Sequence, residues 1–82
     1  MDGWKMTKWT KDETLRVADW LKAQDWQRPS LAACTDLAKQ LDRSIGSVRY
    51  KAAMLISARD DFTGVPLHYT KLDKEIVSGF EN

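Results

Sequence analysis

The chain has 82 residues, a length that suits one small domain and leaves no room for a second. With one cysteine and one histidine, the chain cannot form an internal disulfide or a zinc site built from Cys and His alone. A composition of 43% hydrophobic and 30% charged residues indicates a folded domain, and no apolar run approaches the roughly 20 residues of a membrane span, so we expect an intracellular, cytoplasmic protein without a membrane partner.

The first helix is predicted from a capping box. We expect residues 1–9 to form an N-terminal arm, after which Thr10 and Glu13 have the Ser/Thr-x-x-Glu spacing that satisfies two amides at a helix start. The helix should end near Ala23 to Asp25. Its apolar side chains recur at the spacing of one buried stripe: Leu15, Val17, Ala18, Trp20 and Leu21.

A second helix is predicted after the break at residues 27–29, where a proline disfavours helical geometry in the residue before it. Ser30 is the expected N-cap. Cys34 is interpreted as a small buried hydrophobe rather than a reactive thiol. The predicted apolar stripe of this helix is Leu31, Cys34, Leu37, Ala38 and Leu41.

The third predicted helix spans residues 44–57 and follows the second after a very short connection, with Ser44 as N-cap. Its core stripe is expected to contain Ile45, Val48, Ala52, Leu55 and Ile56. This spacing leaves on an adjacent face Gly46, Arg49, Tyr50 and Ala53.

We expect a loop over residues 59–69 and a fourth helix over residues 70–82, where Thr70 and Asp73 form a second capping-box pattern. The predicted fold class is therefore all-α. Residues 10–58 should form a three-helix bundle of the helix-turn-helix type, with the C-terminal helix packed on it or extending from it.

Positive charge is concentrated in the N-terminal arm and around the third helix. The net charge is only +1, yet residues 43–59 hold four basic residues and no acidic one. In the helix-turn-helix class the third helix lies in the major groove of DNA. The main hypothesis is a DNA-binding module that docks residues 44–57 in the major groove of double-stranded DNA; chance clustering on a solvated helix face is the alternative.

Base contacts are predicted on the first turns of this helix, because small residues there allow close approach and long polar ones reach base edges. Arg49 has the planar fork that fits guanine. For Tyr50 a DNA contact and a half-buried ring at the core edge are both open. The predicted base contacts are Gly46, Ser47, Arg49, Tyr50 and Ala53. The predicted contacts to the DNA backbone are Arg43, Ser44, Lys51, Arg59, Lys5 and Lys8.

The stretches KWTKDETLRVADWL and LAKQLDRSIGSVRYKAAML resemble the Myb/SANT-like, homeodomain-like group of domains. The matching positions are Trp9, Thr10 and Glu13, then Leu37, Ala38 and Leu41, then Arg43, Ser44, Val48 and Lys51. Ala52 stands where that group has its last core tryptophan.

A second resemblance also covers the C-terminal third, and is to the region that precedes the catalytic domain in some prokaryotic HNH-type restriction endonucleases. It rests on the third helix, on Gly64 and on the stretch KLDKEI with Phe80. This resemblance implies a DNA-binding part without the nuclease, either the targeting part of a larger enzyme or a small transcriptional regulator, nucleoid-associated if the source is prokaryotic.

A protein-interaction module of the SANT kind, or a small inhibitor or regulator, is the alternative function, favoured by the near-neutral charge and by the acidic residues 60–82. Catalysis by this chain alone is not expected, because no nucleophile and base can be grouped around His68, the single histidine. No catalytic residue, metal ligand, cofactor or small-molecule substrate is predicted.

Overall fold

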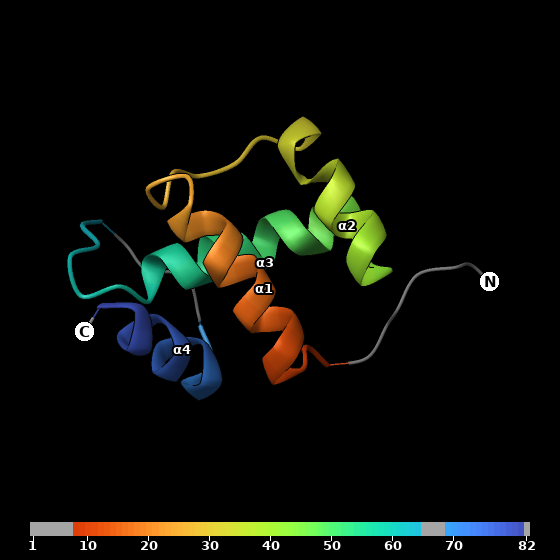
Figure 1. The fold of residues 1–82 in the computed structure, drawn as a ribbon. Helices are drawn as coiled ribbons and strands as arrows, with labels where there is room; N and C mark the ends of the chain where they lie inside the picture. Colours follow the sequence, from red (N-terminus) through yellow and green to blue (C-terminus); the bar gives the residue numbers. More distant parts are fainter. Residues whose placement is uncertain (1–7, 65–68, 82) are drawn as a thin grey trace.

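The computed structural model describes residues 8–64 and 69–81, and all regular structure in this part of the chain is helical. The elements are α1 (Lys11–Lys22), a 3-10 helix η1 (Ala32–Cys34), α2 (Thr35–Leu41), α3 (Ile45–Ser57) and α4 (Lys71–Glu81). The all-α prediction is confirmed. The helices form a unit with a radius of gyration of 12.1 Å (Figure 1).

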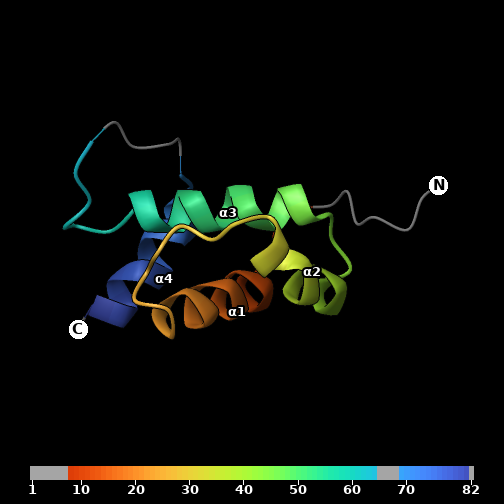
Figure 2. The same cartoon turned by 90° about the horizontal axis from the view of Figure 1, so that it is seen from above.

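Helix α3 is the central element, because it contacts α1, η1, α2 and α4. Figure 2 shows that α1, α2 and α4 all lie to one side of α3, which leaves its opposite side uncovered by any helix. Helix α4 packs against both α1 and α3. The C-terminal helix is therefore docked on α1 and α3.

The core is apolar and draws on every α-helix. Fully enclosed side chains include Val17 and Leu21 of α1, Val48 and Leu55 of α3, and Val77 of α4. Burying a side chain of this size stabilises a fold by about 1.5–3 kcal/mol. Within the described residues, a cluster of thirteen buried apolar side chains thus stabilises a domain whose single cysteine is free.

Both predicted capping boxes are present. At α1 the Thr10 Oγ1 accepts from the Glu13 amide at 3.1 Å, and Glu13 Oε1 accepts from the Thr10 amide at 3.0 Å. At α4 the Thr70 Oγ1 accepts from the Asp73 amide at 3.1 Å, and Asp73 Oδ2 accepts from the Thr70 amide at 3.0 Å. Each box satisfies two amides that a helix start leaves without intrahelical partners.

The second helix differs from its prediction. The chain enters it through η1, where Ser30 Oγ accepts from the Ala33 amide at 3.2 Å, and α2 begins only at Thr35. Leu31 precedes both and is 51% exposed, so its place in the buried stripe was wrong. A 3-10 turn rotates side chains by a different angle per residue than an α-helix, so the α-helical spacing does not hold across it.

Candidate nucleic-acid interface

The uncovered side of α3 carries the predicted base contacts. Gly46, Arg49 and Tyr50 are exposed, and Ser47 and Ala53 are partly exposed. Tyr50 is 57% exposed, so its ring lies on the surface and does not seal the core. The structure therefore brings all five residues to one solvent-facing strip of the first three turns.

A cleft lies on one side of this strip, with a volume of about 280 Å³. Its lining consists of Arg28, Leu31, Gly46, Arg49, Tyr50 and Ala53. Arg28 was absent from the predicted interface. It belongs to the connection between α1 and η1, and no local pattern reveals that this connection passes beside α3.

A second cleft, of about 510 Å³, lies on the other side of Tyr50. It is lined by Lys8, Trp9, Ser47, Tyr50, Lys51, Met54, Thr70 and Leu72. Lys8 is exposed, as a phosphate contact requires, whereas Lys5 lies outside the described residues. Tyr50 thus forms a ridge between two hollows.

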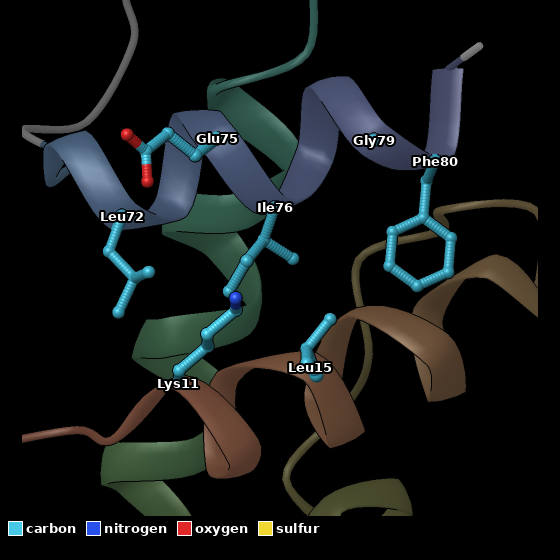
Figure 3. Close-up of a pocket in the computed structure, with 7 residues that line it drawn as sticks. All are labelled: Lys11, Leu15, Leu72, Glu75, Ile76, Gly79 and Phe80. Carbon is cyan, nitrogen blue, oxygen red and sulfur yellow. The ribbon is translucent and has the colours of Figure 1, made fainter.

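Neither of these clefts has a carboxylate in its lining. Two other hollows of the described surface do have carboxylates in their linings. The groove between α1 and α4, about 360 Å³ in volume, is lined by Lys11, Glu75 and several apolar side chains (Figure 3). The hollow beside the C-terminal end of α3 includes Asp25 and Asp61. The linings of the two clefts beside the exposed strip of α3 therefore contain basic side chains and no acidic ones.

Arg43 was predicted to contact the DNA backbone, but the residue is only 2% exposed. Its Nη2 and Nε donate to the two carboxylate oxygens of Glu13, at 2.8 and 3.1 Å, and Nη2 also donates to the Lys8 carbonyl at 3.0 Å. The guanidinium lies 4.2 Å from the centroid of the Trp9 ring. A cation enclosed in this way cannot reach a phosphate, so we remove Arg43 from the interface.

Lys51 was also predicted to contact the DNA backbone, and it too is buried. The residue is 4% exposed, and its Nζ donates to Oδ1 of Asp73, which is fully buried, at 3.0 Å. The same ammonium lies 5.4 Å from the Trp9 ring centroid. Lys51 lines the floor of the second cleft, but its charge is committed to α4 rather than to a partner.

Trp9, Glu13, Arg43, Lys51 and Asp73 together form what we call the buried ionic frame. Each acid of the frame belongs to a capping box, and each cation reaches it from another part of the chain. The frame joins the starts of α1 and α4 to the α2–α3 connection and to α3. Its two cations were predicted to bind DNA because sequence alone does not show burial.

Of the other residues predicted to contact the DNA backbone, Ser44 lies beside the exposed strip and Arg59 does not. Ser44 caps α3, where its Oγ accepts from the Ser47 amide at 3.1 Å, and it stays partly exposed at the edge of the strip. Arg59 lies at the opposite end of α3. It pairs with Asp61 at 2.9 Å and its guanidinium lies 4.6 Å from the Trp26 ring centroid, so we remove it from the interface. This hydrogen-bonded pair lowers the pKa of the Asp61 carboxyl.

Arg49 is attached to the neighbouring loop. Its Nε donates to the Pro29 carbonyl at 3.3 Å, while the residue as a whole remains exposed. Nearby, Cys34 is buried as predicted, and burial raises the pKa of its thiol while the positive charge of Arg49 opposes that rise.

Comparison with known proteins gives no further identification: no protein-family model, curated protein or solved structure matches the chain. Across residues 8–64 and 69–81, no three His, Cys, Asp or Glu side chains are grouped as they would be around a metal ion. In the same part of the chain, none of the helices has the length and apolar character that crossing a bilayer requires. His68, considered above for catalysis, lies outside the described residues.

Proposed function

We propose that the chain is a double-stranded DNA-binding module of the helix-turn-helix type, which places α3 in the major groove. The observation that carries the proposal is the strip of α3 just described. It combines small residues, one outward arginine and two flanking clefts that contain basic side chains and no acid. A polyanion favours such a surface, because each cation that meets a phosphate releases condensed counterions.

The connection between α2 and α3 supports this class. Asp42 ends α2 in a left-handed conformation at φ 56°, Arg43 follows, and Ser44 already caps α3. Such a tight turn is typical of two helices that cross at a steep angle, with the second one presented to DNA.

The proposed contacts fall into two groups, one to base edges and one to phosphates. Arg49, on the exposed strip, has a guanidinium fork suited to O6 and N7 of a guanine. Lys8 and Arg28 flank the strip in different clefts, so we assign them to phosphates on the two sides of the groove. Ser44 adds a hydroxyl at the start of α3.

A fluorescence-anisotropy titration with a labelled duplex tests the proposal. Two or three phosphate contacts predict that affinity falls roughly 10- to 40-fold when salt rises from about 50 to about 200 mM. Absence of binding at the lower salt concentration would contradict the proposal. Lys39→Ala, a charge removed from the exposed side of α2 away from both clefts, is the control that should leave affinity unchanged.

A protein-interaction module is the second candidate, favoured by one observation. Leu31 and Tyr50 are the large hydrophobic residues exposed on the described surface, and both line the first cleft beside Arg28 and Arg49. An acidic segment with an apolar anchor would fit this combination. Leu31→Ser separates the candidates, since it should leave duplex affinity within about twofold if DNA is the partner and abolish an apolar anchor site if a protein is.

A further inference from the structure

The connection between α1 and η1 contains an unusual turn. Asp25 and Trp26 both adopt left-handed backbone conformations, at φ 57° and 59°. Two consecutive non-glycine residues in this region are uncommon, because Cβ crowds the backbone there. Such a conformation persists only where the surrounding structure holds it.

Contacts of Trp26 keep the turn in this conformation. Its ring lies against the Arg59 guanidinium, 4.6 Å from the ring centroid, and meets the Phe80 ring edge-on, with centroids 5.9 Å apart at 79°. Its backbone amide donates to the Leu21 carbonyl at 2.8 Å. Contacts from α1, α4 and the end of α3 therefore fix the turn.

Three residues later this connection reaches the proposed interface. Pro29 is buried, and its carbonyl accepts from Arg49 Nε at 3.3 Å. This is the side-chain hydrogen bond that Arg49 makes within the described residues, and it leaves the two terminal nitrogens of the guanidinium to face a partner. Arg28, adjacent to Pro29, is placed at the cleft by the same segment.

We propose that Trp26 is a positioning residue for Arg49: the turn at Asp25–Trp26 sets the Pro29 carbonyl, which holds the guanidinium fork toward the outside of α3. The part of this inference that concerns DNA affinity rests on the proposed function. An arginine held in place loses less conformational freedom on binding than a free one, so the turn raises affinity and selectivity without touching DNA itself.

A double-mutant cycle tests the coupling. Trp26→Ala should weaken binding to the preferred duplex by about fivefold or more, and by less than about twofold in the Arg49→Ala background. Trp20→Ala removes an equally large, partly buried ring from α1 and is the control, for which the effect should be the same in both backgrounds. Equal losses for Trp26→Ala in the two backgrounds would overturn the proposal.

A second measurement needs no DNA and separates this inference from the proposed function. In an NMR spectrum of the labelled protein, the Arg49 Nε–H signal should be shifted and protected from exchange, and Trp26→Ala should move it to the position of a free arginine. An unchanged signal would overturn the inference even if the chain binds DNA. If Trp26→Ala does not fold, Arg59→Gln removes one contact of the Trp26 ring, and the same displacement of the Arg49 signal is expected.

Discussion

The buried ionic frame and the exposed strip of α3 use the same residue types for opposite purposes. Arg43 and Lys51 belong to the same acid-free run as Arg49, yet they are 2% and 4% exposed whereas Arg49 faces solvent. The difference lies in their partners. Folding brings Glu13 and Asp73 to the first two, whereas the hydrogen bond that Arg49 makes within the described residues is to a backbone carbonyl. A run of positive charge therefore does not define a binding surface until its acidic partners are located.

The largest expected effect is on stability, from breaking the frame. Lys51→Ala removes the cation paired with the fully buried Asp73, and Arg43→Ala removes the guanidinium that donates to both carboxylate oxygens of Glu13, so each should lower the free energy of unfolding by about 3–5 kcal/mol. Urea denaturation followed by tryptophan fluorescence measures the loss. A loss below about 1 kcal/mol would show that the frame is dispensable.

Replacing both partners sharpens this result. In Lys51→Met with Asp73→Asn the buried charges disappear together, while an amide oxygen can still accept from the Thr70 amide. Most of the stability lost in Lys51→Ala should return, because the cost arises from an uncompensated charge rather than from the lost pair itself.

Substitutions on the exposed strip should change DNA affinity rather than stability. Arg49→Ala should cost about 1–3 kcal/mol in affinity for the preferred duplex, less for random DNA, and little in stability. Lys8→Ala should weaken binding to both duplexes alike and reduce the salt slope by about 1. Anisotropy titrations on the two duplexes measure this, and equal losses for Arg49→Ala would show that it touches only the backbone.

A smaller effect is expected from replacing Gly46 by alanine, and the same replacement at Gly79 is the matched control. A Cβ added at Gly46 or at Gly79 would meet nothing within 4 Å, so the fold itself does not require glycine at either position. Alanine should raise stability by up to about 1 kcal/mol at both helical sites. Only Gly46→Ala should weaken DNA binding, and equal affinities for the two variants would show that α3 does not approach DNA closely at this turn.

The smallest effect concerns pH. Because burial raises the pKa of the Cys34 thiol, its contribution to stability is complete below the pKa of an unfolded cysteine, about 8.5, and is lost as pH rises above it. Wild type should therefore lose more stability than Cys34→Ala between pH 8 and pH 10 in paired urea denaturations. Parallel pH profiles for the two proteins would contradict this assignment.

Local chemistry was predictable and tertiary pairing was not. The capping boxes at Thr10 and Thr70 were found from sequence because each needs only residues three positions apart. The burial of Arg43 and Lys51 was not, because their partners lie 30 and 22 positions away. Arg28 was missed for the same reason.

Tyr50 shows where periodicity stops being informative. Its spacing placed it beside the core stripe of α3, and only the arrangement of the neighbouring helices decides whether such a position is covered. Here α1, α2 and α4 gather on the other side, so the ring stays 57% exposed.

The central claim is that the exposed strip of α3 binds DNA while the buried ionic frame holds the fold. Titrating the ¹⁵N-labelled protein with duplex DNA at low salt tests it most directly. The claim predicts amide shifts concentrated at residues 46–53 and at Arg28, with the α1–α4 groove around Glu75 unaffected. Shifts confined to that groove, or no shifts at all, would contradict it.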